Sequence, residues 1–267
     1  MSSIISNTLN YVRVRLREIV RPLSLSPILV LGNQKTGTTV IAGLLAEHTG
    51  LTSTLDLPGM YEPTQTQLHD GSLSFDQFVA QNRGDFSRDI VKEPCLTFLY
   101  PQLRSRFPNS SIVFIIRDPR DNIRSILNRL SIPGDLTSLS ENELESLTPE
   151  WKLIVDGSWM GLSGENYIDL LADRWRRAAT VYLEHRASVR LVRFEDFLED
   201  KVGTIATLAT DLGLDSVCDI SDRVDVQYQP RGNRDVSWSE FFGDENLQRI
   251  EETCHPVMKE FGYSPSG

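Results

Sequence analysis

The sequence predicts a single α/β domain with a central parallel sheet flanked by helices. Short apolar segments typical of buried strands alternate with longer segments whose apolar residues recur every three or four positions. This alternation implies parallel strands joined by right-handed crossovers, and no internal repeat or linker divides the chain. The expected strands cover residues 27–31, 89–92, 111–117 and 189–194, and the expected helices cover residues 38–48, 74–79, 95–106, 118–131, 166–185, 201–212 and 244–261.

Local signals support these elements in chain order. The first strand ends at Gly32, and Ser74 can cap the helix that follows it. Residues 111–117 form the most apolar strand candidate, and Asp118-Pro119 then supplies a helix cap with proline at the first helical position. The helix at 166–185 carries an apolar stripe on one face, to which Trp175 belongs, so we expect Trp175 in the core.

Residues 132–150 differ from the rest of the chain. They contain Pro133-Gly134 and five acidic residues, with no Lys or Arg. This composition predicts a solvated loop or a flexible cap within the domain.

Composition limits the function. The chain has 267 residues, 40% of them hydrophobic and 24% charged, with a formal net charge of −10. That charge argues against nucleic-acid binding through a general basic surface, but it allows a local basic pocket for a small anion. The three widely spaced cysteines match neither a disulfide framework nor a zinc site, which favours a reducing compartment.

The N-terminal segment, residues 1–26, is predicted to form an amphipathic helix ahead of the main domain at 27–267. Residues 11–23 place Val12, Leu16 and Ile19 on one face and three arginines on another, which suits packing on the core or peripheral contact with a membrane surface. No run of 18 apolar residues and no signal-like leader occurs, so we expect a cytoplasmic protein. The sequence does not indicate an oligomeric state.

The segment Gly32-Asn33-Gln34-Lys35-Thr36-Gly37-Thr38-Thr39 lies between a predicted strand and a predicted helix. Successive backbone N–H groups and a helix N-terminus at such a place can hold a phosphate. The spacing is that of an ATP-type phosphate loop, but Thr38 replaces the lysine expected after the second glycine, and Lys35 lies inside the loop. Lys35 can therefore offset charge that develops on a leaving group.

A second motif begins where the 111–117 strand ends. Arg117 should emerge at the carboxyl edge of the sheet, where open α/β folds bind ligands, and its planar fork suits phosphate oxygens. Ser125, two helical turns further on, can add a hydroxyl donor. A capped helix whose arginines form only surface ion pairs is the alternative.

Together the two motifs resemble those of the 3'-phosphoadenosine 5'-phosphosulfate (PAPS) dependent sulfotransferase family. Lys35-Thr36-Gly37-Thr38-Thr39 is similar to the family's loop for the 5'-phosphosulfate, and Arg117 with Ser125 is similar to its segment for the 3'-phosphate. Two weaker similarities follow: Arg193-Phe194-Glu195-Asp196, which would place Phe194 near adenine, and Pro230-Arg231-Gly232 with Trp238, which would help hold the 3'-phosphate.

The resemblance implies a P-loop architecture like that of nucleotide kinases and a catalytic function. It implies direct in-line transfer of a sulfuryl group from PAPS to an acceptor hydroxyl or amine, with PAP as the product and no metal. A carbohydrate, a lipid or another small molecule could be the acceptor. The family often has a mobile acceptor-gating loop after the helix that carries Ser125, so the resemblance also implies that residues 132–150 act as a lid. Two alternatives stay open: an ATP-dependent P-loop kinase, and a non-catalytic nucleotide-binding module of the same fold.

Transfer to a hydroxyl requires a base within hydrogen-bond reach. Cytosolic members of the family have a histidine after the second strand, where this chain has Lys92-Glu93-Pro94, so Glu93 is the first candidate. Glu62 is the second, because Tyr61-Glu62-Pro63 resembles a stretch in some carbohydrate sulfotransferases, and His69 is the third. Tyr61, Trp151 and Trp159 could line the acceptor pocket.

Overall fold

The sheet contains five parallel strands in the order β2-β3-β1-β4-β5. A computed structural model of the chain describes residues 22–162, 164–225 and 236–265. The predicted α/β architecture with a central parallel sheet is therefore confirmed. In chain order the strands are β1 (Ile28–Gly32), β2 (Ser53–Thr54), β3 (Ile90–Lys92), β4 (Ile112–Ile116) and β5 (Val189–Arg193).

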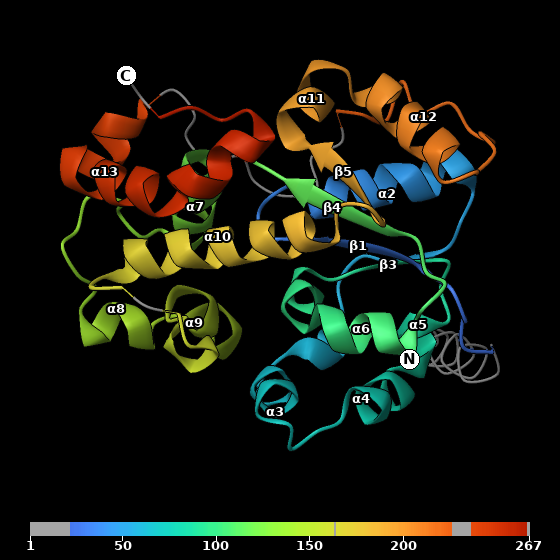
Figure 1. The fold of residues 1–267 in the computed structure, drawn as a ribbon, viewed down its shortest axis with the longest axis horizontal. Coiled ribbons are helices and arrows are strands. Elements are labelled where there is room, and N and C mark those ends of the chain that lie inside the picture. Colours follow the sequence, from blue (N-terminus) through green and yellow to red (C-terminus); the bar gives the residue numbers. More distant parts are fainter. Residues whose placement is uncertain (1–21, 163, 226–235, 266–267) are drawn as a thin grey trace, which may run out of the picture.

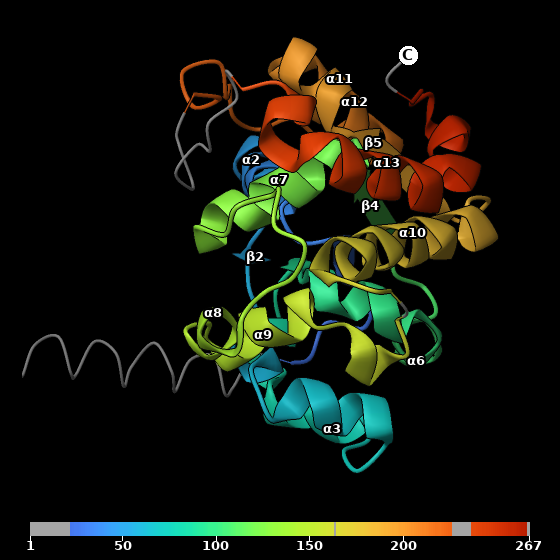
Figure 2. The same ribbon diagram turned by 90° about the vertical axis from the view of Figure 1, so that its left-hand side faces the viewer.

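Helices cover both faces of this sheet (Figure 1). Figures 1 and 2 both show α2, α11 and α12 on one side and α6 and α10 on the other. The α-helices are α2 (Thr38–Thr49), α3 (Thr64–Asp70), α4 (Phe75–Gln81), α5 (Arg83–Phe86), α6 (Tyr100–Arg106), α7 (Pro119–Leu130), α8 (Glu141–Glu145), α9 (Pro149–Val155), α10 (Tyr167–His185), α11 (Phe194–Glu199), α12 (Lys201–Asp211) and α13 (Trp238–Met258); the 3-10 helices are η1 (Pro58–Met60), η2 (Pro94–Leu99), η3 (Ser158–Met160) and η4 (Lys259–Phe261).

The strands divide their side chains between two apolar cores. In β4, Phe114 packs with α7 and α10 on one face, while Val113 and Ile115 pack with α2 and α12 on the other. Side chains alternate between the two faces of a strand, so a strand that is apolar at every position must be covered on both sides. This requirement explains the unbroken apolar runs of β1 and β4 and leaves their carboxyl ends as the free edge for a site.

Two helices differ from the prediction at prolines and glycines. The expected helix at 95–106 is divided into η2 and α6, because Pro101 lacks an N–H and its ring clashes with the preceding turn. The last long helix begins at Trp238 instead of residue 244, since Ser237 and Glu240 form a capping box ahead of a kink at Gly243. Trp175 is fully buried, as predicted.

The segment 132–150 is more ordered than a solvated loop. It contains α8, and its leucines at 136, 139, 144 and 147 pack against the core. Asn246 of α13 fixes the start of the segment by donating to the backbone oxygens of Gly134 and Leu136 at 2.8 and 2.9 Å. The sequence interpretation gave weight to the acidic residues and did not consider these leucines, which attach the segment to the core. Whether the segment moves as a lid remains a prediction.

Most of the predicted N-terminal helix lies outside the described residues. The described chain starts at Pro22, and Leu23 packs against the core. Within the part of the chain that the structure describes, no helix has the length and apolar character needed to cross a membrane.

Candidate active site

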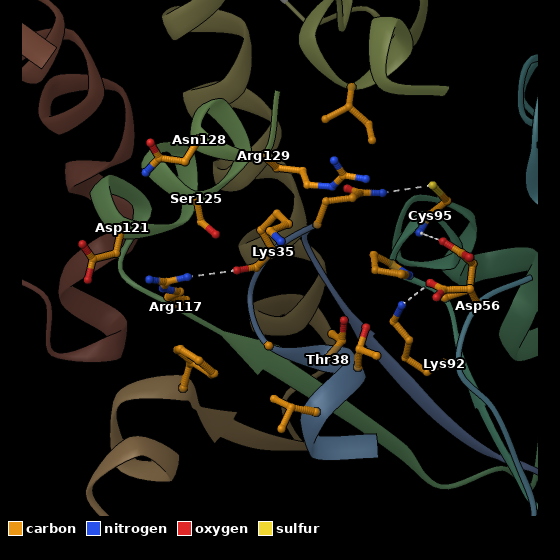
Figure 3. Close-up of a pocket in the computed structure, with 18 of the residues that line it drawn as sticks. Lys35, Thr38, Asp56, Lys92, Cys95, Arg117, Asp121, Ser125, Asn128 and Arg129 are labelled. Carbon is orange, nitrogen blue, oxygen red and sulfur yellow. Dashed lines mark hydrogen bonds and ion pairs between the residues drawn. The ribbon is translucent and has the colours of Figure 1, made fainter. Parts of the chain in front are cut away.

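A cavity of about 730 Å³ opens at the carboxyl ends of β1, β3, β4 and β5 (Figure 3). This is the edge at which parallel α/β sheets place their ligands. The cavity brings together both sequence motifs, which are about 80 residues apart in the chain. The predicted site residues that line it are Lys35, Gly37, Thr38, Thr39, Glu93, Arg117, Ser125 and Phe194.

The loop between β1 and α2 has a backbone suited to holding an anion. Lys35 has a positive φ of 67°, Gly37 has a φ of 98°, and α2 begins at Thr38 with no side-chain cap. The N–H groups of the first turn of α2 are therefore free of a side-chain acceptor at the N-cap, and the helix dipole adds positive potential there. Thr36 is buried and donates its hydroxyl to the Asn33 oxygen at 2.9 Å, so its role is to shape the loop.

Gly37 is required by both its conformation and its surroundings. A Cβ at this position would lie 2.3 Å from the Phe194 ring, and the φ of 98° disfavours any L side chain. Phe194 is buried, lines the cavity and also contacts Arg117, whose guanidinium carbon lies 5.0 Å from the ring centroid. Phe194 thus joins the loop to the second motif.

The second motif is fixed to the loop and to the core. Arg117 is 7% exposed and donates from Nη1 to the Lys35 backbone oxygen at 3.2 Å. Its own backbone oxygen accepts the indole N–H of Trp175 at 2.8 Å. Ser125 is half-buried on α7 and lines the same cavity. Figure 3 shows the Arg117 and Ser125 side chains on the same side of Lys35.

Asn122, which the sequence reasoning did not single out, clamps the loop to α7. Its amide donates to the Gln34 backbone oxygen at 2.7 Å, and its side-chain oxygen accepts from the Asn33 amide at 2.9 Å. Asn122 is fully buried. A fully polar amide one turn into an otherwise amphipathic helix was the available signal, but its partners are 88 and 89 residues away.

Arg174 is a second residue that the sequence reasoning missed. This arginine of α10 is 0% exposed and donates from Nη2 to the side-chain oxygen of Gln34 at 2.9 Å. Burial lowers the pKa of its guanidinium to about 10. The Gln34 amide donates in turn to the Cys95 sulfur at 3.0 Å. Arg174, Gln34 and Cys95 thus form a buried polar network that holds the loop in place.

Several cationic side chains gather around Lys35 although the chain is acidic overall. Burial, together with the nearby charges of Arg129, Arg117 and Lys92, lowers the pKa of Lys35 to about 8. Lys92 is buried and its ammonium lies 2.5 Å from the Asp56 carboxylate. A cluster of cations at the end of a parallel sheet is the local basic pocket that the composition allowed.

The base candidates lie in different surroundings. Glu93 lines the cavity, and its carboxylate accepts the backbone N–H groups of Cys95 and Leu57 at 3.0 and 3.2 Å. Burial raises the pKa of Glu93, against the opposing effects of Lys92 and these N–H groups. Glu62 does not line the cavity, and its carboxylate accepts both the hydroxyl and the N–H of Thr66.

His69 also lies outside the cavity lining. Its ring packs edge-on against Trp159, with 4.6 Å between the ring centroids. Burial and the positive charges of Arg174 and Arg177 lower the pKa of His69. Of the aromatic residues considered for the acceptor pocket, Tyr61 and Trp151 line the cavity and Trp159 does not. The structure therefore favours Glu93 by position among the three candidates.

The C-terminal loop is described only in part. Arg231 and Gly232 lie outside the described residues. Trp238, at the end of that loop, donates its indole N–H to Asp121 at 2.9 Å, and its ring lies 3.8 Å from the Arg120 guanidinium carbon. Arg124 donates to the Val236 backbone oxygen at 2.7 Å. The described end of the loop is thus attached to the helix that carries Ser125.

Comparisons with known proteins concern the structure, since no protein-family profile and no curated protein matches the sequence. Mouse sulfotransferase SULT7A1 complexed with PAP is similar with a TM-score of 0.54 and 14% identity, over 88% of this chain and 85% of that one. The chain has the sulfotransferase fold. Sulfotransferase STF9 from Mycobacterium avium is also similar, with a TM-score of 0.51 and 12% identity, over 97% of this chain and 82% of that one.

The sulfotransferase domain from the curacin biosynthetic pathway aligns with this chain over nearly the full length of that domain. Its TM-score is 0.51 at 14% identity, over 90% of this chain and 99% of that domain. These similarities confirm two predictions from the sequence: the resemblance to sulfotransferases and the P-loop-like architecture. At identities this low, structural similarity establishes the fold alone. The donor and the acceptor must therefore be argued from the cavity itself.

Proposed function

We propose that this chain is a PAPS-dependent sulfotransferase that transfers a sulfuryl group to an acceptor hydroxyl or amine. The observation that carries the proposal is the convergence of the Lys35 loop with Arg117 and Ser125 in one cavity. An ATP-type phosphate loop alone would not require a second anion site. PAPS carries a 3'-phosphate as well as a 5'-phosphosulfate, so it matches both sites.

The donor would be held by backbone and side-chain groups already in place. The loop N–H groups and the hydroxyls of Thr38 and Thr39 would bind the 5'-phosphate at the start of α2. Arg117 and Ser125 would bind the 3'-phosphate, and Phe194 would pack near adenine. Arg231 and Gly232 are proposed to complete the 3'-phosphate site.

Transfer would proceed directly from donor to acceptor. The bond between sulfur and the bridging oxygen of the 5'-phosphosulfate breaks as the acceptor oxygen forms a bond to sulfur. The electron pair of the broken bond stays on the 5'-phosphate of PAP, where the Lys35 ammonium would offset the developing charge. The proposed mechanism uses no metal, and among the described residues no group of three or more His, Cys, Asp or Glu side chains is placed to hold one.

Glu93 is proposed to take the acceptor proton. Its burial favours the protonated form, which makes the ionised carboxylate a stronger base than an exposed glutamate. Its two N–H contacts hold the carboxylate at the edge of the cavity. Tyr61 and Trp151 line the same cavity and would contact the acceptor, whether carbohydrate, lipid or another small molecule.

The direct test is to follow PAP formation from PAPS with a panel of phenol, sugar, lipid and amine acceptors in the presence of EDTA. The proposal predicts PAP formation that depends on an acceptor and persists without divalent metal. The kinase alternative predicts instead transfer of the γ-phosphate of ATP in the presence of magnesium, with no turnover of PAPS. A non-catalytic module would bind PAP and turn over neither nucleotide.

A further inference from the structure

Arg129 lies on α7 one helical turn beyond Ser125 and lines the same cavity. Residues four apart occupy the same face of a helix, so α7 presents both side chains together. Figure 3 shows the Arg129 side chain extending from α7 to the side of Lys35. Neither sequence motif includes Arg129, and no role in donor binding has been assigned to it above.

The positive charge of Arg129 lowers the pKa of Lys35. Among the charged groups that lower the Lys35 pKa, Arg129 acts more strongly than Arg117 or Lys92. Across residues 22–162, 164–225 and 236–265, no carboxylate lies within ion-pair distance of Arg129. Two cations directed at one region repel each other unless an anion lies between them.

Trp151 limits where the Arg129 fork can lie. The guanidinium carbon is 6.0 Å from the centroid of the Trp151 ring, which comes from α9. A contact of this kind orients a guanidinium without neutralising its charge. Arg129 therefore remains available to an anion in the cavity.

We infer that Arg129 is a further catalytic residue, which binds the sulfuryl oxygens of the donor during transfer. The inference rests on the proposed function. The loop and Arg117 account for the two phosphates of PAPS, and the sulfuryl group is the remaining anionic part. A planar fork donates two parallel hydrogen bonds to such an oxyanion, which a single ammonium cannot do. Lys35 then acts on the bridging oxygen while Arg129 acts on the group that moves.

The test compares PAPS with PAP, which differ only in the sulfuryl group. We expect Arg129→Ala to weaken PAPS binding by at least about tenfold in titration calorimetry while changing PAP binding by less than about threefold. Arg129→Lys keeps the charge and loses the fork, so the expected loss of PAPS affinity is intermediate. Thermal unfolding of each variant checks that the exposed position leaves the fold intact.

Arg106→Ala is the matched control. Arg106 also lies in the last turn of its helix, with its guanidinium 5.2 Å from a Phe107 ring, but it does not line this cavity. It should leave both affinities unchanged. Equal losses for PAPS and PAP in Arg129→Ala, or no loss for either, would overturn the inference. Failure of the unaltered protein to bind PAP would instead overturn the proposed function and the inference with it.

Discussion

Trp175 donates its indole N–H to the backbone oxygen of Arg117 at 2.8 Å, and this bond ties the anion site to the centre of α10. Trp175 is fully buried, so this bond is shielded from bulk solvent. Trp175→Phe should lower the free energy of unfolding by about 1–3 kcal/mol, because the carbonyl is left unsatisfied. It should also weaken PAP binding, since Arg117 loses its support; urea unfolding and calorimetry measure the two effects.

Trp159→Phe is the control for that prediction. The Trp159 indole also donates to a backbone oxygen, that of Leu153 at 2.8 Å, but Trp159 is only half-buried and does not line the cavity. PAP affinity should be unchanged in Trp159→Phe. If the two variants weakened PAP binding equally, the proposed link between Trp175 and the anion site would be wrong.

Lys35→Ala should reduce kcat much more than it reduces PAP affinity. The ammonium mainly meets charge that forms on the bridging oxygen in the transition state, and loss of one such group typically costs about 10²–10³ in kcat. Steady-state kinetics with PAPS and titration of PAP give the two quantities. Turnover equal to that of the unaltered protein would remove Lys35 from the mechanism.

Donor binding should depend on pH through Lys35. Its pKa of about 8 in the free protein should rise when an anion binds beside it, so binding takes up a proton near that pH. PAP affinity should therefore be constant well below pH 8 and fall as the pH rises through about 8. Calorimetry in buffers of different ionisation enthalpy measures the proton uptake directly, and Lys35→Ala should abolish it.

Glu93→Gln should remove most of the turnover, whereas Glu62→Gln should leave it nearly intact. Glu93 lines the cavity, and Glu62 is held by Thr66 outside it. Because burial raises the pKa of Glu93, kcat/KM should fall as the pH drops through that raised value and the carboxylate gains a proton. The opposite ranking of the two variants would transfer the role of base to Glu62.

Local sequence signals were sufficient for the main elements. The apolar runs of β1 and β4, the Asp118 cap with Pro119 and the stripe on α10 each depend on residues close in the chain. They placed the Lys35 loop and Arg117 at one sheet edge without reference to tertiary structure. The two-residue strand β2 had no comparable signal, since its place is set by pairing with β3.

The supports of the site could not be predicted in the same way. Asn122 and Arg174 reach Gln34 across 88 and 140 residues, and nothing near them in the sequence specifies that partner. A buried arginine on an amphipathic helix is also contrary to the usual pattern, in which charges lie on the exposed face. Such pairs are defined by the packing of α7 and α10 against the loop.

Titration calorimetry of PAP and of ATP, each with and without magnesium, tests the central claim most directly. The account predicts tight binding of PAP that is independent of magnesium, with weak binding of ATP, because Arg117 and Ser125 select a 3'-phosphate that ATP lacks. Preference for ATP in the presence of magnesium, with weak binding of PAP, would contradict the account and favour a kinase.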